Sequence, residues 1–510
     1  MTNYGLAPIS IEKKYRDEVH LRFAKEDFVS VCSALHRVLK SPVRMMFARE
    51  QQQNYAVSAV FLDDQLHRWV FAEIEITKTD PQYPALSQEM FSASLFEREI
   101  EEMFGIRPQG SPDQRRLRLH DEVWPDKAFP LRKDFSLPAN SALGQYDFTR
   151  VAGEGVFEIP VGPVHAGIIG PGHFRFSVAG EPIILLEERL GFAHRGVEKL
   201  MEGRTLEQGL SLAERVAGEA AFSHSLALAM AAEKIAGLAL SENTRAWRAV
   251  LLELERIYNH INGLGGIALD VGASWPADLA ACLKEACLNM NRQLTGSRFL
   301  KGINCLGGFT RQLTGEQRQL INRLLPPIMV DLGRLQEVLN GNEIFLDRIE
   351  TTGVLKETTA RDLGVSGLTA RASGIPFDLR QSFPILYERL GFRPLTKKSG
   401  DVWSRYKLRL AEIEQSVDLI NKLLELCTDV APAPKVVLQA GEALGYIEGW
   451  RGATLYWLSI DAAGLIDRCK IVDPSFHNWP ALAYAVLGEI IPDFPVCNKS
   501  FDLSYPGNDL

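Results

Sequence analysis

The chain lacks any arrangement of cysteines that would suit a metal cluster or a disulfide framework. Its 7 cysteines are scattered, and no two of them form a Cys-x-x-Cys pair. Cys282 and Cys287, the two closest in sequence, would lie on different faces of a helix. Cysteines in odd number and without a pattern are typical of a reduced, cytosolic protein. We therefore expect the chain to bind no metal and no cofactor by itself.

Long apolar runs, a leader segment and an excess of basic residues are absent as well. No stretch approaches the roughly 18 apolar residues of a membrane-spanning helix. The most apolar stretch, Leu226 to Leu240, is interrupted by Glu233 and Lys234. The N-terminus shows no basic region followed by an apolar core, so no secretory signal is visible. The net charge of −8 argues against binding to nucleic acid. Any contact with a membrane should be peripheral.

The sequence patterns predict an α+β chain with more than one domain. The 510 residues exceed one ordinary core, and about two to four domains are expected. Residues 1–135 read as an α+β unit, with a helix near Lys25–Leu39 and strands at Tyr55–Leu62 and Trp69–Ile76. Residues 136–155 are rich in turn formers and read as a linker.

Residues 156–510 read as a helix bundle with β elements at both ends. Phe157 to Gly180 is β-like, and helical patterns dominate from about Gly196 to Leu339. Apolar residues between Val250 and Ile261 form one helical stripe. Tyr406–Cys427 alternates steps of four and three, as in a seam between packed helices. Thr454–Ile460 returns to a strand pattern.

A dense set of charges in the first domain carries a family resemblance. The segments 96–106, 111–117 and 130–135 together are similar to the 30-kDa-type core subunit of respiratory complex I, with Glu102 and Ser111 departing from its usual residues. Acids and arginines of this kind can form a buried ion-pair lattice that fixes a docking surface, which we favour over a catalytic role. The expected docking residues are Glu97, Arg98, Glu99, Arg115, Arg116, Arg132 and Lys133.

The rest of the chain resembles the large subunit shared by complex I and membrane-bound [NiFe] hydrogenases. The motifs that carry this resemblance are residues 162–176, 194–199, 255–260, 268–273, 371–380 and 448–452. In such hydrogenases, two Cys-x-x-Cys pairs hold the nickel–iron centre. The four corresponding positions here are Ala217, Ala220, Ser504 and Gly507. None can supply a thiolate, which is the soft ligand such a centre needs.

The resemblance also locates the groups that would move protons, and several are changed. The hydrogenase acid that relays protons corresponds to Gly170, and the tyrosine that binds quinone in complex I corresponds to Gly218. The loop histidine of complex I corresponds to His173 or to the position of Ile169, and its aspartate partner to Asp270. With His165 of the same loop, these residues are the catalytic candidates: His165, His173 and Asp270.

Small residues and a few polar ones should line the place where the metal sits in hydrogenases. That place either leaves space for a ligand or water, or is filled by neighbouring side chains. Glu219 is either a buried acid of raised pKa that carries protons, or a group facing solvent or Arg215, and His224 reads as a satisfied core histidine. The expected lining is Ala217, Gly218, Glu219, Ala220, His224, Arg451, Ser504 and Gly507.

Two functions are compatible with this resemblance. In the first, the chain passes electrons from an iron–sulfur cluster in a neighbouring subunit to a quinone or similar acceptor. In the second, it is a non-catalytic scaffold that couples an electron-transfer arm to a membrane arm. In both, the resemblance implies an ion-translocating hetero-oligomeric complex at the cytoplasmic face of a membrane. Its partners would be a small iron–sulfur subunit, a polyferredoxin-like subunit and antiporter-like membrane subunits.

Overall fold

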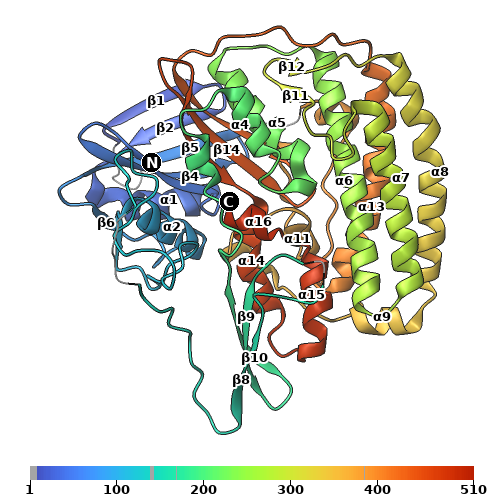
Figure 1. Cartoon of the computed structure of the whole chain (residues 1–510), viewed down its shortest axis with the longest axis horizontal. Coiled ribbons are helices and arrows are strands. Elements are labelled where there is room, and N and C mark those ends of the chain that lie inside the picture. Colours follow the sequence, from blue (N-terminus) through green and yellow to red (C-terminus); the bar gives the residue numbers. More distant parts are fainter. Residues whose placement is uncertain (1–7, 138–142, 168, 384) are drawn as a thin grey trace.

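The computed structural model describes residues 8–137, 143–167, 169–383 and 385–510. It contains an N-terminal α+β unit, a projecting three-stranded sheet, and a helix bundle joined to a second three-stranded sheet (Figure 1). The α+β class expected from the sequence is confirmed.

The N-terminal unit is a five-stranded sheet with helices packed against it. Its strand order is β1-β2-β5-β4-β3, and only the β2–β5 pair is parallel. The two strands expected from alternating apolar residues are β4 and β5. The elements are β1 (Ser10–Tyr15), β2 (Glu18–Arg22), α1 (Phe28–Leu39), β3 (Met45–Glu50), β4 (Asn54–Asp63), β5 (Arg68–Thr77), β6 (Gln82–Pro84), α2 (Ser94–Phe104) and β7 (Arg107–Gln109).

The predicted linker, residues 136–155, lies partly outside the described residues, because 138–142 are not among them. Residues 143–155 form no helix or strand. They lead into the projecting antiparallel sheet of order β10-β9-β8, at the bottom of Figure 1. Its strands are β8 (Val156–Val161), β9 (His173–Ala179) and β10 (Ile183–Arg189). The exact domain boundaries remain a prediction.

Four long helices lie side by side to form the bundle (Figure 1). They are α6 (Glu242–Asp270), α7 (Ser274–Thr295), α8 (Gly315–Asn340) and α13 (Val402–Leu426). In the seam predicted for α13, Tyr406, Ile413 and Ile420 are fully buried. The apolar stripe predicted for α6 is buried, and the rest of the helix is buried as well, since every residue from Ala246 to Ile261 is enclosed. The helix is enclosed because it packs on α7 and α13 and also on α5 and α15, so its charged residues face protein.

The second sheet separates two hydrophobic cores. All residues of β14 (Ala453–Ile460) are buried, and its side chains alternate between the two faces. Leu455 and Trp457 belong to the core shared with the N-terminal unit, whereas Tyr456 and Leu458 belong to the core shared with the bundle. The neighbouring strands are β13 (Gly441–Glu448) and β15 (Ile466–Val472).

Helix α5 (Ala221–Ile235) lies directly on this sheet. A Cβ atom at Gly445 would lie 1.9 Å from the carbonyl oxygen of Ala227 on the helix. Glycine on the strand and alanines on the helix therefore permit this close approach. The shorter elements around the sheet and bundle are α3 (Val197–Met201), α4 (Leu206–Ala213), β11 (Asn304–Cys305), β12 (Gly308–Phe309), α9 (Glu343–Ile349), α10 (Glu357–Asp362), α11 (Gly367–Ala372), α12 (Leu379–Ser382), α14 (Pro474–Ala485), α15 (Phe494–Phe501) and α16 (Tyr505–Asp509).

Buried ion pairs join the N-terminal unit to the sheet. Glu99 of α2 accepts from Lys470 of β15 at 2.5 and 2.6 Å and from Arg118 at 2.7 Å. Lys470 lies also 3.2 Å from Glu198. The Arg118 guanidinium reaches further and donates to the carbonyl oxygen of Asn508, close to the end of the chain. In the part of the chain that the structure describes, no helix is long and apolar enough to cross a membrane.

Replacing Glu99 by Gln should destabilise the chain strongly. The change leaves the buried Lys470 and Arg118 with one carboxylate fewer, and breaking a buried pair in this way costs about 3–5 kcal/mol. Urea unfolding of the purified protein, followed by fluorescence, measures the loss. Glu357→Gln is the matched control, because the Glu357–Arg361 pair is exposed and should contribute less than about 0.5 kcal/mol. Equal effects in the two variants would contradict the role of Glu99.

Candidate functional site

The two segments with the missing cysteines meet at one place, although about 290 residues separate them. Ala217 precedes and Ala220 ends the short 3-10 helix Gly218–Ala220 that leads into α5, and Ser504 and Gly507 lie at the start of α16. Arg195 ties the segments together. Its guanidinium donates to the carbonyl oxygens of Arg215 and Val216 on one side and of Pro506 on the other.

In the second segment, Ser504 and Gly507 make contacts with neighbouring groups of the protein. A Cβ atom at Gly507 would lie 2.7 Å from the carboxylate carbon of Asp473. The Ser504 hydroxyl accepts a hydrogen bond from the amide of Gly507 and so caps α16. The Asp473 carboxylate thus lies where a side chain at Gly507 would project. Of the two outcomes left open, filling by a neighbouring side chain is seen at this position.

Asp473 belongs to a buried chain of three polar side chains. His224 Nε2 lies 3.0 Å from Asp473 Oδ2, and His224 Nδ1 lies 2.8 Å from Tyr456 Oη. Because the carboxylate can only accept, Nε2 donates to it and Nδ1 accepts from the tyrosine hydroxyl. Burial alone would raise the pKa of Asp473, but the His224 hydrogen bond and nearby Arg451 hold it below its usual range. His224 is a satisfied core histidine, as the sequence indicated.

The open side of the site is formed by Gly218, Glu219 and Arg451. The Glu219 side chain is 34% exposed, which agrees with the second of the two alternatives, a group facing solvent, and its ion-pair partner is Arg451 at 2.7 Å rather than Arg215. The Arg451 guanidinium also lies 4.0 Å from the ring centre of Trp450, and its Nη1 is buried without a hydrogen-bond partner among the described residues. A Cβ at Gly218 would meet only Lys301 Nζ, at 3.9 Å. A side chain at Gly218 would therefore meet no close neighbour, unlike a side chain at Gly507.

On the opposite side, Tyr505 fills the space at Gly170, the position matched to the proton-relay acid of hydrogenases. A Cβ at Gly170 would lie 2.6 Å from Tyr505 Cδ2, and a Cβ at Gly172 would lie 2.6 Å from Tyr505 Cε1. The ring also packs on Trp479, with centroids 4.8 Å apart. Two glycines in the loop thus accommodate one aromatic ring.

The structure does not bring the three catalytic candidates together. His165 Nε2 faces the carbonyl oxygen of Gly172 at 2.8 Å, and His173 Nδ1 faces that of Gly162 at 3.1 Å. Both histidines therefore hold the two sides of their own loop. Asp270 ends α6, where burial raises its pKa and Lys499 partly opposes the rise. Among the described residues, no hydrogen bond or ion pair joins Asp270 to either histidine.

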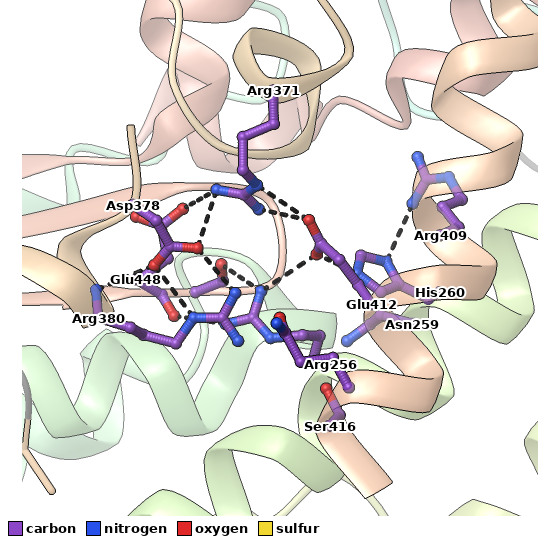
Figure 2. A network of polar contacts seen from close by, with 12 residues as sticks. Arg256, Asn259, His260, Arg371, Asp378, Arg380, Arg409, Glu412, Ser416 and Glu448 are labelled. Atoms are coloured by element: carbon purple, nitrogen blue, oxygen red, sulfur yellow. Dashed lines mark hydrogen bonds and ion pairs between the residues drawn. The ribbon is translucent and has the colours of Figure 1, made fainter. Parts of the chain in front are cut away.

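Beneath the site lies a buried network of charges (Figure 2). Arg371 contacts Glu412 at 2.8 Å and Glu448 at 2.8 Å, so it bridges α13 and β13. Glu412 also accepts from His260 Nε2 at 2.9 Å. Burial lowers the pKa of His260 to about 4, so the ring is neutral at pH 7, and its Nδ1 accepts from Arg409 at 3.3 Å. The further members are Glu253, Arg256, Asp378 and Arg380.

This network explains three of the sequence motifs at once. Segments 255–260, 371–380 and 448–452 come from different parts of the chain and supply most of the charges (Figure 2). Glu412 was missed by sequence reasoning because it lies in the α13 seam pattern without a motif of its own. Its only signal was a charged residue next to Ile413 in a buried helix.

The expected docking residues form contacts within the chain. The Glu97 carboxylate accepts from the amides of Leu86 and Ser87, and burial raises its pKa to about 7. Arg98 donates to the carbonyl oxygens of Arg115 and Arg116. The contacts of the rest are Arg115 with Asp113 and Glu187, Arg116 with Asp121, Arg132 with the carbonyl oxygen of Phe104, and Lys133 with Glu202 and Asp467.

An open groove of about 590 Å³ lies over Arg98, Arg115 and Arg116. Docking of another protein at this groove remains a prediction. Glu198 is paired with Arg468 at 2.8 Å and with Lys470. Burial would raise its pKa, but these two cations lower it.

Comparison with known proteins agrees with this architecture. The profile described as respiratory-chain NADH dehydrogenase, 30 Kd subunit, matches residues 21–141, and that described as the 49 Kd subunit matches residues 270–438. The chain is 31% identical over 476 residues to formate hydrogenlyase subunit 5 of Escherichia coli (strain K12), covering 90% of this chain and 83% of the relative. It is 33% identical over 352 residues to the D-type subunit of NADH-quinone oxidoreductase from Carboxydothermus hydrogenoformans, covering 68% of this chain and 96% of the relative.

A solved structure shows the same fold over most of the chain. A chain of the membrane-bound sulfane sulfur reductase, described as an archaeal respiratory membrane complex, superposes with a TM-score of 0.65 at 26% identity, covering 70% of this chain and 99% of that one. The protein is thus a fusion of a 30-kDa-type and a 49-kDa-type unit. It belongs to the family of hydrogenase-like large subunits found in complex I and formate hydrogenlyase, and the resemblance seen in the motifs is confirmed.

Placing a side chain at Gly507 should destabilise the site. In Gly507→Ala the new Cβ would lie 2.7 Å from the Asp473 carboxylate, and overpacking of this kind costs about 1–3 kcal/mol. Thermal unfolding measures the loss. Gly333→Ala is the control, since a Cβ there meets no atom within 4 Å. If Asp473 fills the space, combining Gly507→Ala with Asp473→Ser should cost less than the sum of the two single changes. Strict additivity would contradict this packing.

Proposed function

We propose that this chain is the large subunit of a membrane-associated, ion-translocating oxidoreductase complex that works without a nickel–iron centre. It takes electrons from an iron–sulfur cluster of an adjacent small subunit and passes them to a quinone or similar acceptor. A polyferredoxin-like subunit and antiporter-like membrane subunits complete the assembly, which lies at the cytoplasmic face of the membrane. Membership of the family, whose relatives include NADH-quinone oxidoreductase and formate hydrogenlyase subunits, supports this proposal.

The observation that carries the proposal is the replacement of the ligand set. None of Ala217, Ala220, Ser504 and Gly507 has a thiol, and the Asp473 carboxylate fills the space beside Gly507. A nickel–iron centre needs soft thiolate ligands, whereas Asp473 is a hard oxygen donor already engaged with His224. The residues present therefore do not fit that centre.

The acceptor is proposed to bind at the open side of the site. Gly218 is half-buried and has no side chain, and near it Arg451 offers the buried Nη1 donor that has no partner among the described residues. A guanidinium can hold a carbonyl oxygen and stabilise the negative charge that it gains on reduction. Glu219 orients Arg451 through the 2.7 Å ion pair. These contacts suit a quinone-like carbonyl acceptor.

Protons must accompany the electrons, and the site contains the buried hydrogen-bonded chain Tyr456–His224–Asp473, whose Asp473 lies beside Gly507. His165, His173 and Asp270 remain proposed proton carriers, although among the described residues no hydrogen bond or ion pair links Asp270 to the two loop histidines.

The alternative is a non-catalytic coupling subunit, and the packing offers one observation in its favour. The ion pairs of Glu99, Lys470 and Glu198 lock the N-terminal unit to the sheet beside the filled ligand positions. Such a lattice can transmit a displacement from one domain to the other. Electron transfer would then bypass this chain, and changes in the site would alter only stability or ion coupling.

The purified complex should contain no nickel in this subunit and should not turn over hydrogen. The reason is the absence of any thiolate at the four ligand positions. Elemental analysis of the complex, and hydrogen uptake with a viologen dye, provide the measurements. Nickel in a stoichiometric amount, or dye reduction by hydrogen, would refute the proposal.

The change Arg451→Gln should slow acceptor reduction by on the order of 100- to 1,000-fold, the usual loss when one preorganised donor to a developing negative charge is removed. The rate is measured in the intact complex with a short-chain quinone, after gel filtration has shown normal assembly. Arg334→Gln, at an exposed position of α8, is the matched control and should behave as the wild type. A wild-type rate in an assembled Arg451→Gln complex would favour the coupling alternative.

A further inference from the structure

An apolar groove of about 220 Å³ opens on one face of the N-terminal sheet, far in sequence from the remodelled site. Helix α1 packs on β4 and β5, and β2 is the next strand outward in the sheet. The groove therefore lies along the edge of the helix, with strands as its floor. Its wall is formed by Val31, Leu35 and Val38 of α1, and its floor by Val19, Leu21 and Val70 of β2 and β5.

The apolar surface continues onto the rim of the groove. Val38 and Leu66, which line it, are 58% and 59% exposed. Ile11 of β1 lies opposite Leu21 in the antiparallel pair, so the two side chains share a face of the sheet. Ile11 is exposed as well. A contiguous apolar surface of this kind is a feature of binding sites.

Arg68 lies at the end of the groove, where β5 begins. Residues two apart on a strand share a face, so Arg68 lies on the same face as Val70. The residue opposite Arg68 on β4 is Asp63. The Asp63 carboxylate accepts a hydrogen bond from the amide of Leu66 at 3.1 Å. In the part of the chain that the structure describes, Arg68 forms no ion pair with Asp63 or any other acid.

Leu66 and Arg68 also line a second cavity, of about 840 Å³, so the two cavities adjoin at this hairpin. The amide of Trp69 donates to the carbonyl oxygen of Asp17 at 2.8 Å. This bond places the turn between β1 and β2 next to the start of β5. Arg16 of that turn lines the second cavity together with Arg68.

The charge balance of the second cavity is positive. Two of its acids are neutralised, because Asp17 is paired with Lys234 at 2.6 Å and Glu233 with Arg248 at 2.7 Å. The lining charges that form no ion pair among the described residues are Arg16, Arg68 and Arg245 on the basic side and Glu388 on the acidic side. An excess of one sign in a cavity attracts ligands of the opposite sign. An apolar groove thus ends at guanidinium groups that are available to an anion.

We propose that this groove binds one free fatty acid, with the acyl chain between α1 and β2 and the carboxylate on Arg68, beside Arg16. The fork of N–H donors on a guanidinium matches the two oxygens of a carboxylate. The volume of about 220 Å³ is below the roughly 300–1,000 Å³ of pockets for drug-sized ligands. The groove therefore takes one chain and not the two chains of a phospholipid. This site is separate from the proposed acceptor site and does not depend on it.

Titration calorimetry of the purified full chain with hexanoate, octanoate and decanoate tests both parts of the ligand. Each added methylene should lower Kd about 4-fold, which corresponds to the free energy of burying one CH2 group. Octanol has no charge and should bind at least about 10-fold more weakly than octanoate, since it forms no charge-assisted hydrogen bond. Equal Kd values along the series, or for octanol and octanoate, would overturn the inference.

Arg68→Gln should weaken octanoate binding about 10- to 100-fold, the loss expected when a hydrogen bond to a charged group is removed. Arg37→Gln is the matched control, because Arg37 is exposed on α1 and its side chain bonds to the carbonyl oxygen of Ser33 within the helix. This control should keep the wild-type Kd. A wild-type Kd in Arg68→Gln would show that the head group does not bind there.

Val38→Asp places a carboxylate on the wall of the groove and should weaken octanoate binding by at least about 10-fold, because the chain then meets a charge that must stay hydrated. Val330→Asp on α8 is its control, since Val330 is 60% exposed and Val38 58%. Thermal unfolding without ligand shows that both variants are folded. Unchanged binding in folded Val38→Asp would refute the assignment of the groove to the chain.

Co-sedimentation with phosphatidylglycerol vesicles distinguishes a free fatty acid from a membrane surface. We expect wild type and Arg68→Gln to sediment with the vesicles to the same extent, because a phospholipid with two chains does not enter the groove. Loss of vesicle binding in Arg68→Gln would overturn the assignment and give the arginine to a lipid head group.

Discussion

The arrangement of the whole molecule depends on one sheet that is buried on both faces. β14 turns Leu455 and Trp457 toward the N-terminal unit and Tyr456 and Leu458 toward the bundle. A strand in this position cannot alternate polar and apolar residues, so it reads as a continuous apolar run. The same sheet carries Lys470, whose pairing with Glu99 fixes one domain on the other. The site loops are placed by this junction, since Asp473 follows β15 directly.

Much of the fold was predictable because its signals are local. The alternation at Tyr55 and Trp69 predicted β4 and β5, and the four–three spacing after Tyr406 predicted the buried seam of α13. The α6 stripe is buried as predicted, but the burial of its charged face was not predicted, because tertiary packing encloses the helix on every side. The spacing of apolar residues identifies the apolar face of a helix. It does not tell whether the polar face is also buried by neighbouring elements.

The sequence predicted which residues of the site cannot act as thiolate ligands, but only partly which residues lie beside them. The motifs located the two segments and the four residues that cannot bind a soft metal. They gave no sign that Asp473 and Tyr505 would occupy the freed space, because neither lies in a pattern whose spacing encodes the contact. Glu219 shows the limit most clearly: the sequence left burial and exposure both open, and it gave no sign of the ion pair with Arg451 at the open edge. Long-range partners of this kind depend on the folded geometry.

The way in which the ring of Tyr505 lies against Gly170 and Gly172 has an evolutionary consequence. An acid could return to position 170 only if the tyrosine first became smaller, since a Cβ there lies 2.6 Å from the ring. The smaller residue alone would leave a cavity, and cavities in a packed layer are themselves destabilising. Each single change toward an acid at position 170 therefore passes through a less stable protein. The two positions can change only together, so the loop around this aromatic side chain resists replacement one residue at a time.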